Sequence, residues 1–339
     1  MSLTRTATET PPPETLTVPA EWFATVETET ASILTGLRAS RPGQADAVAE
    51  LLAADGGAGS PFRLLAMAVL GALTGEPRPA AVVCAISRLW WAAAEALDDL
   101  ADAPTPEGPG ASTARTTLAA LACGSVLPHW VVDRQPVAPD VRLDWERDLL
   151  RGALDALDGQ LADLAAPVDA PPTWRPVMAC YRGKSGAAYG RDAVMAARLA
   201  TDRPDLLHSC RVFGELFGVL RQVANDAAPD SEDLANGTHT LLLAHAFDTA
   251  GAGHRLRLTR LRAEARHDPD ARARLRAALH DPQVAAGYGR RVESLRRHCC
   301  GLLDRIAPPG PYRDVLHALV HTSARAAVAR PDGGAPWTG

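Results

Sequence analysis

The chain has 339 residues, of which 47% are hydrophobic and 22% charged, and its formal net charge is −5 at pH 7. This composition is typical of a globular protein with enough apolar side chains for a large core. Acidic and basic residues are mixed along the chain, which argues against a nucleic-acid-binding face and against a polybasic segment for anionic membranes.

Thr, Glu and Pro dominate residues 1–18, which lack the apolar run of a signal peptide, so we expect a disordered tail there. Residues 331–339 are expected to be loose. Every apolar stretch is too short or too interrupted to predict a membrane span. The six cysteines lack metal-ligand spacing and fall in helix-like segments, which favours buried thiols and a cytoplasmic protein.

Between these tails the chain is rich in Ala, Leu, Arg and Glu and lacks β-branched alternation, which predicts an all-α protein. Pro- and Gly-rich breaks are too short to separate domains, so we expect residues 19–330 to form one large helical bundle. The predicted helices span about 19–39, 44–54, 61–74, 79–102, 112–127, 140–165, 173–200, 204–227, 240–250, 253–266, 269–280, 282–306 and 312–329.

A first acidic cluster, Asp98, Asp99 and Asp102, ends the predicted helix 79–102. Helical spacing places the three carboxylates on one face, and Glu95 extends the patch. The charges repel one another and meet the negative end of the helix dipole, with no basic residue at helical spacing to offset them. Mg²⁺ would relieve both penalties, because it binds carboxylate oxygens together with substrate phosphates. The tryptophan-containing apolar run before the cluster favours a metal site at the mouth of a cavity over a solvated helix end.

A second polar cluster ends the predicted helix 204–227. Gln222 and Asp226 share a face because they are four residues apart, and Asn225 precedes Asp226 directly. Pro229 stops the helix, so Asp230 would reach the site from the turn. The next two acids are expected to be loop charges.

Lys184 lies between the two clusters and is the only lysine of the chain. Its compact ammonium binds phosphate as a point charge, unlike the guanidinium fork of arginine. Two carboxylate clusters and a cation above an apolar helical cavity predict a site for a diphosphate with an apolar tail.

In this order the motifs resemble those of the trans-polyprenyl diphosphate synthase superfamily, which includes chain-elongating synthases and class I terpene synthases. Asp98-Asp-Leu-Ala-Asp102 resembles the DDxxD motif, Lys184-Ser-Gly resembles the Lys-Thr/Ser-Gly element, and Gln222-x-x-Asn-Asp226 resembles QxxDDxxD. Asp233 to Leu241 resembles the DLxxGKxTL segment. The resemblance covers about residues 56–246 and implies the isoprenoid synthase fold, Mg²⁺ as cofactor and a homodimer.

The departures from the family pattern concentrate where elongating synthases bind their second substrate, isopentenyl diphosphate. Of the early Gly-Lys-Arg-x-Arg-Pro motif only Arg63 remains, and residues 104–110 lack the expected arginine pair. Thr238 replaces the lysine of the late segment. Without these cations a second diphosphate would be held weakly. We therefore expect a terpene synthase that ionises a single allylic substrate, such as farnesyl or geranylgeranyl diphosphate, whose cation then cyclises or rearranges.

The resemblance implies roles for particular residues. The central catalytic residues would be Asp98, Asp99, Lys184 and Asp226. Two metal-binding walls would be formed by Asp98, Asp99 and Asp102 and by Asn225, Asp226 and Asp230. Diphosphate ligands would be Arg182, Lys184, Arg221 and Gln222. The pocket for the hydrocarbon tail would be lined by Trp90, Trp91, Ala93 and Ala94.

Two alternatives stay open at this point. A chain-elongating polyprenyl diphosphate synthase with a remodelled second site would consume isopentenyl diphosphate. A catalytically silent regulatory subunit of such a synthase would fit the altered second cluster, although the intact first cluster and Lys184 argue against it.

Overall fold

The computed structural model describes residues 18–56, 59–102, 111–167, 169–228 and 233–328. Within these ranges the chain consists of helices and connecting turns, with no strand, so the all-α prediction is confirmed. Both predicted tails fall outside the described residues, except for Val18.

The helices are α1 (Ala20–Arg38), α2 (Pro42–Ala54), α3 (Leu65–Thr74), α4 (Ala81–Asp102), α5 (Ala111–Leu121), α6 (Leu127–Asp133), α7 (Pro139–Leu164), α8 (Trp174–Tyr181), α9 (Ala187–Ala197), α10 (Pro204–Asp226), α11 (Asp233–Asn236), α12 (Leu241–Thr249), α13 (Ala252–Ala265), α14 (Pro269–Leu279), α15 (Pro282–Ile306) and α16 (Pro311–Ala326). Short 3₁₀ turns, η1 (Pro61–Leu64) and η2 (Arg78–Ala80), precede α3 and α4, and π-helical turns η3 (Ala122–Val126) and η4 (Arg182–Gly186) join α5 to α6 and α8 to α9.

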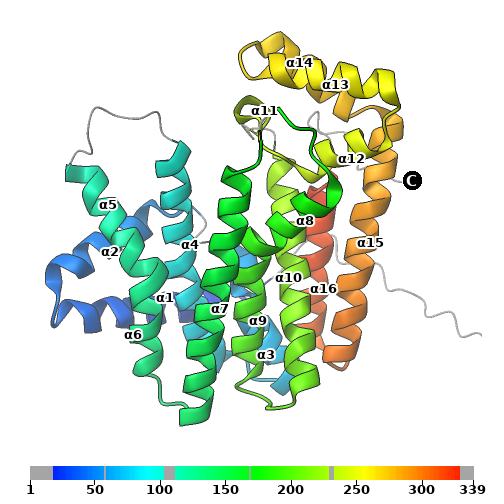
Figure 1. Cartoon of the computed structure of the whole chain (residues 1–339). Helices are drawn as coiled ribbons and strands as arrows, with labels where there is room; N and C mark the ends of the chain where they lie inside the picture. The colour runs from blue at the N-terminus through cyan, green and yellow to red at the C-terminus, as the bar shows by residue number, and fades with distance from the viewer. Residues whose placement is uncertain (1–17, 57–58, 103–110, 168, 229–232, 329–339) are drawn as a thin grey trace, which may run out of the picture.

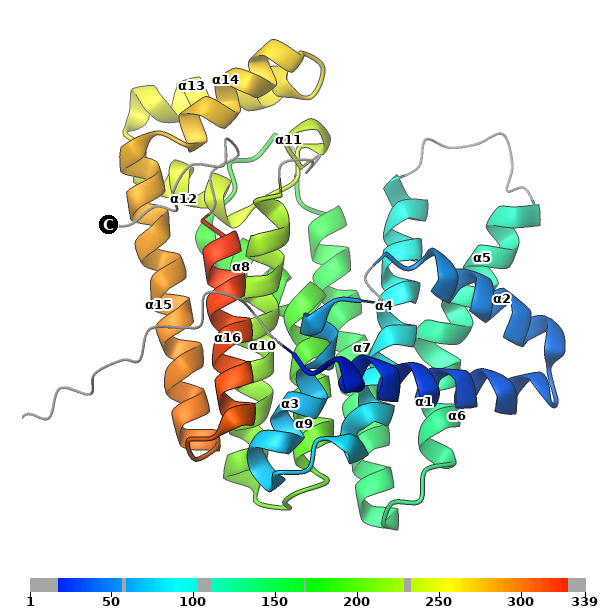
Figure 2. The same ribbon diagram turned by 180° about the vertical axis from the view of Figure 1, so that it is seen from behind.

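The long helices stand side by side around α9, which contacts α3, α4, α7 and α10 (Figure 1). The hairpin of α15 and α16 packs on the other side of α10. Figure 2 shows α1 crossing the back of this bundle, and the pair α13–α14 lies above it. The three helices α4, α7 and α10 all end at the upper edge in Figure 1, so their C-terminal residues meet at one end of the bundle.

Proline and side-chain caps set where several helices begin. Proline occupies the first turn of α7, α10, α15 and α16, where its missing N–H has no intrahelical partner to lose. The side chains of Asp281 and Thr240 accept hydrogen bonds from backbone N–H groups at the starts of α15 and α12. Such caps explain why sequence patterns locate these helices to within a residue or two.

One large apolar core includes residues of helices from α1 to α16, and a smaller cluster joins α12, α13 and α14. The segment Arg78–Leu100, which contains most of α4, is long and apolar enough to cross a membrane, contrary to the expectation from the sequence. Its most apolar window is 67% buried inside the bundle, as in the central helix of a folded core.

Candidate active site

A charged cluster lies where α4 and α7 end. The Lys184 ammonium nitrogen is 3.4 Å from Asp98 Oδ1 and 3.2 Å from Asp163 Oδ2. Gln160 of α7 donates a 2.8 Å hydrogen bond to Asp98. Burial alone would lower the pKa of Lys184, but the two carboxylates outweigh it and raise the pKa. Lys184 is therefore held as a cation beside the first acidic motif.

Glycines bring the Lys184 segment into contact with helices on both sides. A Cβ at Gly159 of α7 would lie 2.3 Å from the backbone nitrogen of Lys184, and one at Gly183 would lie 2.7 Å from Gly159 Cα. On the other side, a Cβ at Gly218 of α10 would lie 2.7 Å from Gly186 Cα. Real side chains do not tolerate such distances, so the absence of Cβ atoms is what allows η4 to fit between α7 and α10. A π-helical turn at this place is typical of functional sites.

Asp226 of the second motif is fixed by a chain of hydrogen bonds. Tyr181 donates to one carboxylate oxygen, and Gln222 donates to the other at 2.9 Å. Gln222 in turn accepts a 2.6 Å hydrogen bond from Ser185 of the π-helical turn. The second motif is thus bound to the same turn that carries Lys184.

Burial raises the pKa of Asp226 to about 7, and the negative charges of Asp233 and Asp163 contribute to the rise. Asp233, which begins α11 and which the sequence indicated to be a loop charge, therefore lies near enough to act on Asp226. Carboxylates from α4, α7, α10 and α11 gather at one end of the bundle. Such an excess of negative charge, built from hard oxygen donors, suits Mg²⁺.

The other predicted metal ligands are described only in part. Asp99 and Asn225 are exposed, whereas Asp102 lies in the last turn of α4 with its side chain outside the description. Asp230 lies outside the described residues altogether. The metal-binding roles of these residues stay predictions.

Of the predicted diphosphate ligands, only Lys184 and Gln222 belong to the cluster just described. Arg182 is exposed, and its charge acts on Glu215. The Arg221 guanidinium lies 3.7 Å from the ring centroid of Phe62. Burial lowers the pKa of Arg221, and the neighbouring Tyr189 offsets part of this shift. The Arg221 guanidinium therefore packs on an aromatic ring of the core.

The predicted pocket residues lie in and around that aromatic core. Trp91 packs against Tyr189 at 5.4 Å between ring centroids and meets Trp90 edge to face at 5.0 Å. Ala93 is buried, and its Cβ would lie 3.3 Å from a Cβ at Gly124 of η3, so its small size serves helix packing. Ala94 is half-buried.

Arg63, the one basic residue left of the early motif, is engaged in two ion pairs. Its guanidinium lies 2.6 Å from Asp55 and 2.5 Å from Glu95 of α4. It also lies 5.9 Å from the ring centroid of Trp91. No basic residue lies at helical spacing from Glu95 on α4. The positive charge beside Glu95 comes instead from Arg63 of η1.

Replacing Asp226 by asparagine is expected to raise the melting temperature in alkaline buffer by about 2–4 °C. The folded protein holds a proton on Asp226 that the unfolded chain releases near pH 4, so the wild type loses stability as pH rises from about 4 to about 7. Asparagine keeps the shape and carries no charge. Thermal melts without Mg²⁺ across this pH range should show a gap between the two proteins that widens up to about pH 7 and then stays constant. A gap independent of pH would contradict the assignment.

Sequence comparisons with protein-family models and with curated proteins give no match. Comparison with solved structures finds similar folds over nearly the whole chain. Geranylgeranyl pyrophosphate synthase from Corynebacterium glutamicum, crystallised with isoprenyl diphosphate and magnesium, is 18% identical with a TM-score of 0.72, covering 90% of this chain and 99% of that one. Polyprenyl synthetase from Streptomyces coelicolor A3(2) is 18% identical with a TM-score of 0.72, covering 89% and 98%. Decaprenyl diphosphate synthase from Rhodobacter capsulatus is 18% identical with a TM-score of 0.68, covering 90% and 96%. The fold of these synthases is the fold that the motif resemblance implied.

Proposed function

We propose that this chain, which has the fold of the polyprenyl diphosphate synthases, binds an allylic prenyl diphosphate with Mg²⁺ and breaks its carbon–oxygen bond. The observation that carries the proposal is the gathering of carboxylates at one end of the bundle, where Asp98 and Asp163 pair with the protonated Lys184 and Asp163 and Asp233 act on Asp226. Trp91, two helical turns before Asp98 on α4, packs against Tyr189 in the apolar core. A polar, cation-binding mouth over an apolar interior suits a diphosphate with a hydrocarbon tail.

In this proposal Asp98 and Asp226, together with their neighbouring motif residues, would hold Mg²⁺ for the diphosphate. Bound Mg²⁺ would neutralise the charge that develops on the diphosphate as it leaves. Lys184, kept protonated by Asp98 and Asp163, would donate hydrogen bonds to oxygens of the diphosphate. Tyr181 and Gln222 would orient the Asp226 carboxylate, because each hydrogen bonds one of its oxygens.

For the fate of the allylic cation, we favour condensation with isopentenyl diphosphate over cyclisation. The solved structures named above, whose folds are similar to that of this chain, are synthases of prenyl diphosphates. This reverses the preference for a terpene synthase that the missing basic residues suggested.

A terpene synthase is the second candidate, and the pairing of Arg63 favours it. Both terminal nitrogens of Arg63 contact carboxylates, which leaves this guanidinium less able to receive a second diphosphate. If the chain is a terpene synthase, breaking the two ion pairs of Arg63 would not make the reaction depend on isopentenyl diphosphate.

The test is an incubation of purified protein and Mg²⁺ with geranyl, farnesyl or geranylgeranyl diphosphate, each with and without isopentenyl diphosphate. Extended diphosphates that require isopentenyl diphosphate, and that disappear in Asp98→Ala, would support the elongating synthase. A hydrocarbon or terpene alcohol from one substrate alone would establish the second candidate. Release of no diphosphate under any condition would overturn both and favour the silent regulatory subunit.

We further propose that the chain forms a homodimer through one apolar face. This face belongs to α5, η3 and α7, and its leucine and valine side chains are more than half exposed: Leu118, Leu121, Val126, Leu143, Leu150, Leu154, Leu157, Leu161 and Leu164. Many of the α7 leucines recur every seven residues, as in helices that pair with other helices. Six of these leucines lie on the single helix α7, and an exposed apolar surface of this size marks an association site.

The six thiols of the chain suit a reducing compartment such as the cytoplasm.

Replacing both Leu154 and Leu161 by glutamate is expected to convert the dimer to a monomer, because two charges per chain would face their symmetry mates in an apolar interface. Light scattering coupled to size-exclusion chromatography measures the mass. Leu256→Glu is the control, because Leu256 is equally exposed but lies on α13, outside this face. A wild-type protein that is monomeric at micromolar concentration would contradict the proposal.

A further inference from the structure

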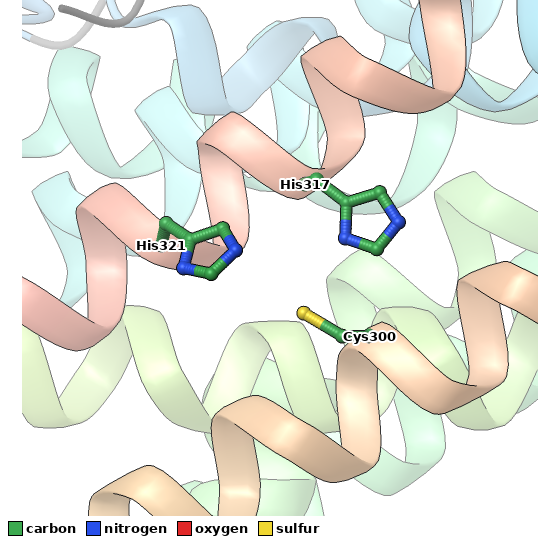
Figure 3. Close-up of side chains that lie close together, drawn as sticks. All are labelled: Cys300, His317 and His321. Atoms are coloured by element: carbon green, nitrogen blue, oxygen red, sulfur yellow. The ribbon is translucent and has the colours of Figure 1, made fainter. Parts of the chain in front are cut away.

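A cysteine and two histidines lie together between α15 and α16, at some distance from the acidic cluster. Figure 3 shows Cys300 of α15 opposite His317 and His321 of α16. One ligand atom from each of the three side chains lies within 4.8 Å of the other two. The two histidines are four residues apart and so share a face of α16, which is the spacing with which helices bind zinc.

The surroundings of His317 fix which ring nitrogen is available. Its Nε2 lies 3.3 Å from Asp304 Oδ1, one turn after Cys300 on α15. A carboxylate that holds one ring nitrogen in this way turns the other, Nδ1, toward a metal and raises its basicity. Arg313 Nη1 also lies 3.4 Å from Asp304 Oδ1, and this ion pair constrains the position of the carboxylate.

A cationic group already lies at the edge of the cluster. The Arg296 Nη1 atom is 3.7 Å from Cys300 Sγ and 3.3 Å from His321 Nδ1. The rest of that guanidinium is held by Glu293 through two 2.7 Å hydrogen bonds. The space between the thiol and the imidazole thus accepts a positive charge, and Glu293 offers Arg296 a place to turn toward when another cation enters.

We propose that Cys300, His317 and His321 form a binding site for a thiophilic divalent transition metal of the Zn²⁺ class. One thiolate and two imidazoles match the ligands of tetrahedral zinc, with a water molecule as fourth ligand. Binding replaces the Cys300 S–H bond by a sulfur–metal bond and releases one proton to solvent. The hard ion Mg²⁺ prefers oxygen ligands and would not compete here.

The position of this site separates it from the diphosphate site. Cys300 and His317 lie near the turn that joins α15 to α16, which is at the lower end of the bundle in Figure 1, opposite the ends of α4 and α10. A metal there would pin the last two helices together and stabilise the fold without touching the diphosphate site. Its presence can be tested independently of any turnover.

The test is a titration of the untagged, metal-free, reduced full-length protein with Co²⁺ in excess Mg²⁺. One equivalent of Co²⁺ should produce a thiolate-to-cobalt charge-transfer band and visible bands of tetrahedral intensity, and Zn²⁺ should abolish both. Cys300→Ser should remove the charge-transfer band. Cys299→Ser is the matched control, because its thiol is buried in the core beside Cys300, and the band should persist in that variant.

Two further variants keep the test sharp if a ligand variant folds poorly. Arg296→Met removes the competing guanidinium and should tighten Co²⁺ binding by about tenfold or more. Asp304→Asn should weaken it by about 10-fold to 100-fold. No charge-transfer band at several equivalents of Co²⁺, or a band that survives Cys300→Ser, would overturn the proposal.

Discussion

Replacing Asp98 by asparagine is expected to lower the rate of diphosphate release by about 10²–10³-fold. Asparagine can still accept the hydrogen bond from Gln160, so the local structure should be kept. The substitution removes a charge that would hold Mg²⁺ and one of the two carboxylates that keep Lys184 protonated. The measurement is the initial rate of pyrophosphate release from an allylic diphosphate in the presence of isopentenyl diphosphate, with unfolding followed by circular dichroism.

Asp133→Asn provides the comparison for this loss. Asp133 is an exposed carboxylate that pairs only loosely, at 3.4 Å, with its neighbour Arg134. Its replacement removes the same formal charge from the chain and should leave the rate unchanged. Equal rates for Asp98→Asn and the wild type would remove Asp98 from the proposed machinery.

Replacing Gly159 by alanine is expected to destabilise the fold by about 1–3 kcal/mol or more and to displace Lys184. The added Cβ would lie 2.3 Å from Lys184 N and 2.8 Å from Gly183 Cα, and all of these are backbone atoms that cannot rotate away. Either α7 or η4 must move. Urea denaturation measures the loss of stability, and the rate assay measures the displacement of the lysine.

Gly43→Ala separates this steric effect from the ordinary preference of helices for alanine. Gly43 lies in the first turn of α2, where an added Cβ would meet no atom within 4 Å. Its replacement should be neutral or stabilise by about 0.4–1 kcal/mol. A Gly159→Ala protein as stable as Gly43→Ala would mean that the two backbones are not in close contact.

The helices could be predicted largely because their ends are marked in the sequence. The helix Pro282–Ile306 begins at a proline and ends just before a Pro-Gly turn, and its predicted bounds are those observed. The helix predicted over 173–200 is instead interrupted by the π-helical turn η4. At this turn glycines of α7 and α10 contact the glycines of η4, and such contacts between distant segments leave no periodic signal in any one of them.

The site was predictable where motifs carry it and not where tertiary contacts do. Asp98 and Asp226 were identified from helical spacing and Lys184 as the only lysine of the chain, and the structure brings them to one end of the bundle. Asp163 and Tyr181 were missed, because nothing near them in the sequence shows that α7 and α8 bring their polar atoms to Lys184 and Asp226. Cys300 was interpreted as an isolated buried thiol, since its two histidine neighbours come from the next helix.

Helix α7 belongs to two surfaces at once. Near its C-terminal end, Asp163 faces Lys184 while Leu161 and Leu164, on either side of it in sequence, are exposed on the apolar face. A subunit pressed against those leucines would stiffen the wall that positions the lysine. Specific activity should then depend on enzyme concentration, falling on dilution below the dissociation constant of the dimer and recovering when the enzyme is concentrated again. Assays at nanomolar enzyme would in that case underestimate the turnover of the assembled protein.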